Sequence, residues 1–291
     1  MHFAAYCDFA GSFAQAIQPA TLAQWRQHLY ETGYTLNSGE RKDYSVNAIN
    51  QRLAAIRGVM TEAAQQGYIT HQVADEFKHV KGLKQVANKD RRSRHARTPI
   101  TSEQMRKLCD QPDTSTLAGK MNRALLLTLA GVGCRITEAV EMTTGQIRWD
   151  TNDETGRSGW VVDIAGKNKA DAEPRAMSNE AHAAIQEWLQ ARREAGVDTE
   201  HIFTGFTGRG DRGMSDKPIS RVSAWEMVGR YAEKAGLSNI KPHDLRRFVG
   251  TQLAKKDLRL AQKQLGHARL ETTAQHYVLD GAPVGATEGL F

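Results

Sequence analysis

Six side chains in the C-terminal two thirds of the chain have the chemistry of a site that acts on a phosphate ester. They are Arg135, Lys167, His243, Arg246, His267 and Tyr277. A guanidinium stays ionised at any working pH and presents a planar fork of donors that fits two phosphate oxygens. Arg135 and Arg246 therefore suit the binding of a phosphodiester and the neutralisation of its transition state. Together the six residues predict a DNA strand-transfer site.

The tyrosine in this set is the expected nucleophile. A phenol has an unperturbed pKa of about 10, so only roughly one in a thousand is ionised near neutral pH without help from its site. Attack by Tyr277 would keep the energy of the broken phosphodiester in a phosphotyrosyl bond, which a 5′-hydroxyl can reverse without ATP. Lys167 is the expected acid for the departing 5′-oxygen, and His243 and His267 are expected to bind the phosphate or move protons.

Three short strings around these residues resemble the sequence boxes of the tyrosine recombinase family, the phage integrases and Xer-type resolvases. A glycine-rich helix end followed by Arg, and by Glu three residues later, matches residues 131–138. The family's His-x-x-Arg matches residues 243–246, and its Leu-Gly-His with a Thr-Thr pair and a tyrosine matches residues 265–277. The resemblance covers roughly residues 20–280. It implies that both arginines bind the phosphate and that the tyrosine is the nucleophile.

The resemblance also assigns the lysine and shows one departure. The family's hairpin lysine follows a glycine and corresponds to Lys167, with Lys169 as its rival. Family members commonly place the tyrosine nine residues after the histidine, whereas His267 and Tyr277 are ten apart, with His276 directly before the tyrosine. In a continuous helix the extra residue would rotate Tyr277 by about 100°. We therefore expect a loop to absorb it.

By this resemblance the protein would be a site-specific recombinase that cleaves and rejoins DNA through a 3′-phosphotyrosine. The implied partners are a double-stranded DNA site, a homotetramer on paired sites and, in some systems, accessory DNA-bending proteins. Type IB topoisomerases use similar residues, but the HDLRR and LGH strings and the small N-terminal helical domain favour the recombinases. The alternative is a DNA-binding protein that keeps this fold without strand transfer, and the extra residue before Tyr277 is its support. The target sequence and the direction of the reaction stay open.

Composition is that of an ordered protein. The chain has 291 residues, of which 40% are hydrophobic and 25% charged, enough for a large core and two domains. It has no apolar run near 18 residues and no signal-peptide pattern, so we expect a cytoplasmic protein without a membrane partner, associated with the nucleoid when bound to DNA. Three cysteines without paired spacing predict neither a disulfide framework nor a zinc site. No cofactor and no metal are expected.

Residues 1–85 have the pattern of a helical, DNA-binding domain. Helices are expected over 21–32 and 71–80, and the strongest apolar stripe, in steps of three and four, runs from Val46 to Ala63. Three polar side chains lie off that stripe and are expected to face DNA: Gln51, Arg52 and Arg57. Most of the net charge of +6 lies before residue 99. We expect a basic linker over 86–98 that lies along DNA, with a solvated basic loop as the alternative.

Residues 99–291 are expected to form the catalytic domain, so the predicted fold class is mainly α with a small three-stranded β-sheet. A capping box joins Thr101 and Gln104, and the glycines at 131 and 133 are expected to turn the chain so that Arg135 points into the site. Strand signals are confined to one region, with Lys167 at a hairpin tip. The expected strands and later helices cover 146–149, 160–165, 174–177, 179–194, 220–235 and 244–253.

Overall fold

The computed structural model describes residues 2–84, 100–153, 155–166, 171–207, 213–267 and 270. They fall into two compact units, one within Met1–Thr98 and one within Pro99–Phe291. Both units are mainly helical, and in the described residues the β structure is limited to sheets of two or three strands. The predicted fold class is therefore confirmed.

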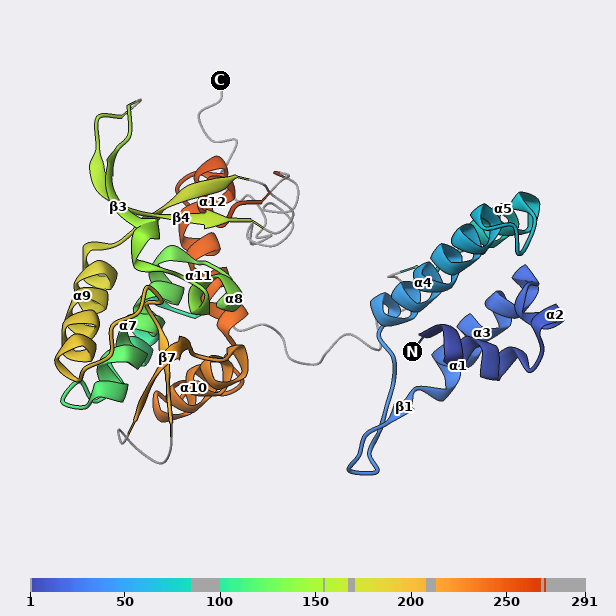
Figure 1. Ribbon diagram of the computed structural model, residues 1–291, viewed down its shortest axis with the longest axis horizontal. Coiled ribbons are helices and arrows are strands. Elements are labelled where there is room, and N and C mark those ends of the chain that lie inside the picture. Colours follow the sequence, from blue (N-terminus) through green and yellow to red (C-terminus); the bar gives the residue numbers. More distant parts are fainter. Residues whose placement is uncertain are drawn as a thin grey trace, which may run out of the picture. The chain divides into compact units, whose positions relative to one another are not determined.

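The N-terminal unit is built around one long helix, α4. Ser45 caps it by accepting a hydrogen bond from the Ala48 N–H at 3.1 Å, and one face of the helix is buried along its length. Tyr6, Trp25 and Phe77 from three other helices pack against that face, as Figure 1 shows for the helices themselves. The helices of this unit are α1 (His2–Ala10), α2 (Phe13–Ala16), α3 (Pro19–Thr32), α4 (Val46–Gln65) and α5 (His71–His79).

Two helices and one hairpin of this unit were not predicted. Helices α1 and α2 are short, and tertiary contacts stabilise them: Tyr6 is fully buried and its hydroxyl donates to the Ala16 carbonyl at 2.9 Å. The hairpin of β1 (Tyr34–Thr35) and β2 (Arg41–Lys42) has two residues in each strand. Strands this short have no readable alternation of apolar and polar residues.

Arg52 and Arg57, which were expected to face DNA, both bond within the unit, and their contact with DNA stays a prediction. Arg57 is half-buried and donates to the Val80 carbonyl. Arg52 donates to the Ala48 carbonyl at 2.9 Å and lies over the Tyr44 ring. A guanidinium beside a backbone carbonyl or an aromatic face gains charge-assisted hydrogen bonds or cation–π contact within the unit.

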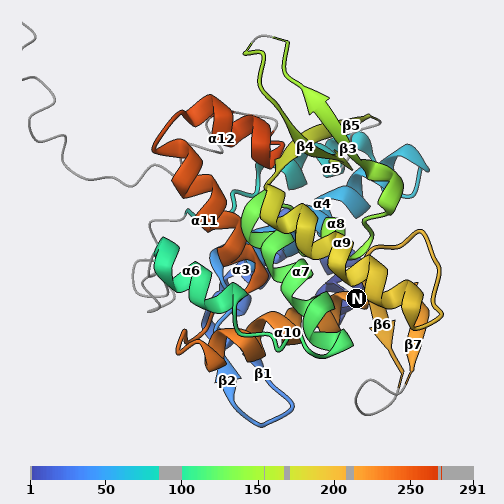
Figure 2. The same cartoon turned by 90° about the vertical axis from the view of Figure 1, so that its left-hand side faces the viewer.

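Helix α7 lies at the centre of the C-terminal unit, between α9 and α11 (Figure 2). Its buried residues include Leu125, Leu126 and Leu129, each fully buried. The predicted capping box of α6 is present, with Thr101 and Gln104 bonded reciprocally. The helices of this unit are α6 (Ser102–Cys109), α7 (Leu117–Val132), α8 (Ile136–Val140), α9 (Asn179–Glu194), α10 (Arg221–Lys234), α11 (Pro242–Ala254) and α12 (Leu258–Leu265).

The predicted three-stranded sheet is confirmed, and its antiparallel strands lie in the order β3 (Ile147–Thr151), β4 (Ser158–Ala165) and β5 (Ala172–Met177). The expectation that strands are confined to this region is wrong. A second, two-stranded sheet pairs β6 (Thr204–Phe206) with β7 (Met214–Pro218). Asp, Lys and Pro in β7 have low strand propensity, which hides this sheet in the sequence.

Candidate active site

A left-handed turn between α7 and α8 positions Arg135. Gly133 has φ +71°, and a Cβ built there would lie 3.0 Å from Val249 and 3.1 Å from Leu265 side-chain atoms. Both the backbone conformation and the close packing therefore require glycine at 133. Gly131 does not take part in the turn, contrary to expectation, because α7 continues through it to Val132.

Arg135 is the residue that caps the start of α8, and Glu138 holds it twice. One carboxylate oxygen of Glu138 accepts the Arg135 backbone N–H at 2.7 Å, and the other accepts its Nη1 at 2.6 Å. The Arg135 side chain is 40% exposed and the Glu138 side chain 10%. The guanidinium is thus anchored on one side and open to solvent on the other.

Arg246 joins three segments of the chain. It lies on α11, is 1% exposed, and donates from Nη1 to the Gly133 carbonyl at 2.8 Å and from Nη2 to the Leu265 carbonyl at 2.6 Å. These bonds attach α11 both to the turn before Arg135 and to the end of α12. The first and third sequence boxes therefore meet on the arginine of the second.

The histidines occupy different positions around this junction. His267 directly follows Gly266, whose φ is +62°, and its backbone N–H and C=O both bond to Gln262, each at 3.1 Å. His243 is exposed near the start of α11, which begins at Pro242. His243 and Arg246 lie three residues apart on that helix, as the sequence indicates.

Two of the six predicted residues, Lys167 and Tyr277, lie outside the described residues, as do Lys169 and His276. Because β4 ends at Ala165 and β5 begins at Ala172, the predicted lysine belongs to the connection between these strands. Both the assignment of the lysine and the effect of the extra residue before the tyrosine stay predictions.

The sequence analysis missed two buried polar residues beside the junction, Arg175 on β5 and Gln264 on α12. Arg175 donates from Nη1 to Glu138 at 3.0 Å. Gln264 bonds both backbone groups of Ala176, at 3.0 and 2.9 Å, and donates to the Val132 carbonyl at 2.9 Å. Strand alternation contains a signal for Arg175, since it shares a face of β5 with the buried Met177.

Burial and charge act in opposite directions on the Glu138 carboxyl. Burial is the largest influence and raises its pKa, but the Arg135 N–H and the charges of Arg175 and Arg135 outweigh it, so the pKa lies below its usual range. Cys134 is fully buried, and burial raises the pKa of its thiol to about 12. A thiol of this pKa is protonated and unreactive at neutral pH, so Cys134 is a buried, structural residue.

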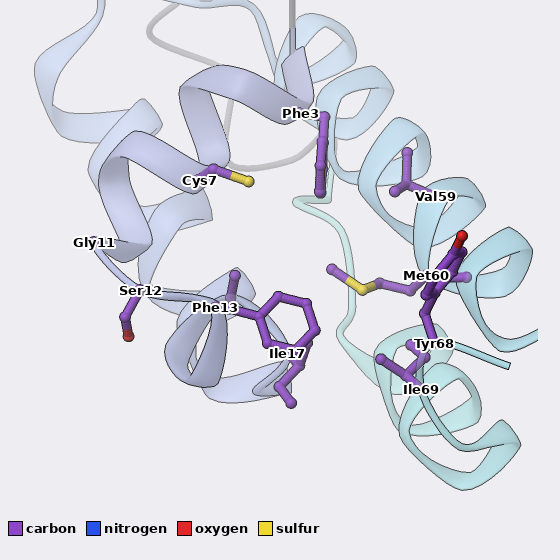
Figure 3. Close-up of a pocket in the computed structure, with 12 residues that line it drawn as sticks. Phe3, Cys7, Gly11, Ser12, Phe13, Ile17, Val59, Met60, Tyr68 and Ile69 are labelled. Atoms are coloured by element: carbon purple, nitrogen blue, oxygen red, sulfur yellow. The ribbon is translucent and has the colours of Figure 1, made fainter.

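Two cavities differ in the kind of side chain that lines them. A cavity of about 310 Å³ beside His267 is lined by Arg259, Gln262 and Lys263. A larger one, of about 430 Å³, lies in the N-terminal unit and is lined mainly by apolar side chains, among them Phe3 and Met60 (Figure 3). Of these two cavities, only the one beside His267 has cationic side chains for a phosphate; Glu173 also lines it, and it adjoins the junction.

Two kinds of feature were not found among the described residues. No group of three or more His, Cys, Asp or Glu side chains there is arranged to hold a metal ion. No helix in the same part of the chain has the length and hydrophobicity needed to span a bilayer.

The family model of the phage integrase family matches residues 99–281, well over half of the chain. The chain belongs to the phage integrase family. The matched residues include the turn before Arg135, all of α11 and α12, and the three boxes on which the resemblance was based.

Curated members of the phage integrase family include relatives of moderate identity. The tyrosine recombinase XerD of Neisseria meningitidis serogroup B is 32% identical over 178 residues, which are 60% of this chain and 56% of the relative. The tyrosine recombinase XerC of Roseiflexus castenholzii is 25% identical over 280 residues, 93% of this chain and 80% of the relative. The match with XerD thus spans little more than half of that protein's length.

Solved structures of phage integrase family members share the fold. The XerH site-specific recombinase bound to palindromic difH substrate, in a post-cleavage complex, has a TM-score of 0.66 and 20% identity, covering 97% of this chain and 75% of that one. A lambda integrase dimer bound to a core site has a TM-score of 0.52 and 17% identity, covering 91% and 81%. At these identities the likeness shows the fold alone.

Proposed function

We propose that the protein is a site-specific DNA recombinase that cleaves and rejoins strands through a covalent 3′-phosphotyrosine. The observation that carries this proposal is the convergence of the three boxes on Arg246, which is bonded to the carbonyls of Gly133 and Leu265. A buried guanidinium and a half-exposed one from a second segment form a rigid site for a phosphodiester. The family membership and the XerD and XerC relatives support the same activity.

In this proposal Arg135 and Arg246 bind the scissile phosphate and stabilise the charge of its transition state. The Tyr277 oxygen attacks phosphorus as its proton passes to His243 or His267, the bond to the 5′-oxygen breaks, and Lys167 gives that oxygen a proton. His243 and His267 bind the phosphate or transfer protons. The 5′-hydroxyl of a second strand then reverses the attack and releases the tyrosine, so the cycle uses neither ATP nor a metal.

The partners follow from the same proposal. Residues 1–85 form a DNA-binding domain, 86–98 a basic linker along the DNA, and 99–291 the catalytic domain. Double-stranded DNA with paired sites is the substrate, and the working form is a tetramer, in line with the solved lambda integrase dimer and tetramer on DNA. The protein acts in the cytoplasm at the nucleoid, with accessory bending proteins where the site requires them.

Covalent capture tests the activity. Randomised duplexes bound by the full chain are selected, and the recovered sequence is rebuilt as a nicked suicide duplex that traps the cleaved state. We expect a protein–DNA adduct that survives denaturing electrophoresis, and none with Tyr277→Phe, which should still bind DNA. The control is Tyr68→Phe, because Tyr68 is an exposed tyrosine of the N-terminal unit. Binding without an adduct would favour the DNA-binding alternative.

A sulfur substitution separates the two candidate acids. A duplex with a bridging 5′-sulfur has a leaving group that needs no proton, so it should restore cleavage by Lys167→Ala. If the 5′-sulfur duplex restores cleavage by Lys169→Ala instead, Lys169 is the general acid. If neither variant is restored, the connection between β4 and β5 takes no part in proton transfer.

A further inference from the structure

Arg175 is a buried cation whose position the phosphate-binding roles do not explain. Its side chain is 0% exposed and lies outside the three sequence boxes, so the proposed function assigns it no contact with DNA. It lies on the inward face of β5 together with Met177, an apolar residue. An apolar side chain of similar volume would fill this space at lower cost, because removing a guanidinium from water is expensive.

The hydrogen bonds of Arg175 point to one partner. Nη1 donates to Glu138 at 3.0 Å, whereas Nε and Nη2 have no hydrogen-bond partner within the described part of the chain. The guanidinium is held against the turn before His267, since a Cβ on Gly266 would lie 2.6 Å from Nη2. Among the described residues, the ion pair with Glu138 therefore leaves two donors of Arg175 unsatisfied.

The Glu138 oxygen that receives Arg175 is also the one that accepts the Arg135 backbone N–H, at 2.7 Å, while the other oxygen holds the Arg135 guanidinium at 2.6 Å. Glu138 lies in the first turn of the short helix α8. Without Arg175, the carboxylate could rotate about its side-chain torsions and take the Arg135 guanidinium with it. With Arg175, it is fixed from the side of the sheet.

We propose that Arg175 is a positioning residue: by fixing Glu138, it sets the place of the Arg135 guanidinium in the site. The proposal rests on the proposed function, since it takes Arg135 as a ligand of the scissile phosphate. It couples the sheet to the site, because β5 is the strand that follows the connection containing Lys167.

A double-mutant cycle tests the route through Glu138. The rate constant of single-turnover cleavage on the selected suicide duplex is measured for Arg175→Met, Glu138→Gln and the double variant. We expect Arg175→Met to lower it by roughly 100-fold, the effect of misplacing a catalytic group by about 1 Å. If Arg175 acts through Glu138, the double variant is no slower than Glu138→Gln alone. Additive losses would overturn the proposal.

The rate constant and the amplitude of cleavage distinguish a misplaced Arg135 from a partly unfolded protein. A variant that is partly unfolded lowers the fraction of protein that reacts, while a misplaced arginine lowers the rate constant of the fraction that is folded. The matched control is Arg192→Met, because Arg192 is equally buried but donates to the carbonyls of residues 199 and 202 on another side of the unit. It should lower amplitude only. Arg175→Lys keeps the charge facing Glu138 and should recover part of the rate.

The outcomes also separate this proposal from the proposed function. A wild-type protein that forms the adduct, together with Arg175→Met at the wild-type rate constant, would overturn the positioning role and leave the recombinase standing. An Arg175→Met variant whose loss is in amplitude alone would do the same. A wild-type protein that forms no adduct on the selected duplex would overturn both.

Discussion

The two units bury different kinds of side chain. In the described residues of the N-terminal unit, the core is apolar and aromatic and Thr21 is the buried polar residue. Its Arg26 and Arg57 lie nearer the surface and donate to the carbonyls of Lys81 and Val80. Among its described residues, the C-terminal unit instead buries three arginines, namely Arg175, Arg192 and Arg246.

This difference in buried side chains indicates which unit is built to fix particular groups in place. Apolar burial stabilises by about 25 cal/mol per Å² and imposes no particular orientation, which suffices for a helical scaffold. A buried guanidinium costs stability but fixes the segments that supply its acceptors. Burial of an arginine is not by itself the mark of a site, because Arg192 only closes a loop onto α9. The mark is a half-exposed arginine, Arg135, attached to the buried ones.

Arg246→Ala should have the largest effect, because it removes a phosphate ligand and leaves the carbonyls of Gly133 and Leu265 without a donor. We expect cleavage to slow by roughly 100- to 1000-fold, measured as adduct formation on the suicide duplex. Arg246→Lys should recover little, since an ammonium lacks the fork that spans both carbonyls. Near-wild-type cleavage by the lysine variant would show that the fork of Arg246 is not needed. The buried arginines would then not distinguish the C-terminal unit from the N-terminal one.

Leu53→Ala tests the apolar core of the N-terminal unit. Leu53 is fully buried on α4, so the cavity should lower the unfolding free energy of this unit by about 3 kcal/mol. Trp25 is the one tryptophan before residue 99, and fluorine NMR of fluorotryptophan-labelled protein reports its unfolding separately. Gln51→Ala, at an exposed position of the same helix, is the control. An equal shift of the signals from the C-terminal unit would show that the units unfold together.

Arg192→Met separates burial of an arginine from function. The carbonyls that Arg192 binds would lose a charged donor, which should lower stability by about 2 kcal/mol, seen as a lower denaturant midpoint. The rate constant of cleavage should be unchanged. A slower rate constant at full amplitude would mean that buried arginines throughout the unit affect the chemistry, and the distinction from Arg246 would fail.

His182 should give the smallest effect, a pH dependence of stability. Its ring stacks on Trp160 with centroids 3.6 Å apart, and burial holds its pKa below the ordinary value of 6.5. The unfolded chain therefore binds the proton more readily, and stability should be highest above about pH 6.5 and fall as the pH drops below it. In the His182→Phe variant, the denaturant midpoint should change less between neutral and mildly acidic pH. If the midpoint changes with pH as much as in the wild type, other titratable groups cause the pH dependence.

Regular patterns and local motifs were readable from the sequence. The apolar stripe of α4, the capping box at Thr101 and the alternation in β4 depend on neighbours within a few residues, so their elements were predicted. Helices α1 and α2 and the strands β6 and β7 were not, because they are short and their stability comes from contacts distant in the sequence. The edge-to-face contact of Tyr6 with Trp25 is such a contact.

The sequence by itself determined the family, the order of the three boxes and the chemistry that their residue types allow. Only the tertiary structure decided what holds those boxes together. Arg246 reaches Gly133 and Leu265 across 113 and 19 residues of chain, and Gln264 reaches Val132 across 132. The physical reason is that a motif specifies side chains by local spacing, whereas a buried donor must be satisfied by whichever carbonyl the packing brings to it. Arg175 is the clearest case, because its charge has a partner only when the fold brings β5 next to Glu138.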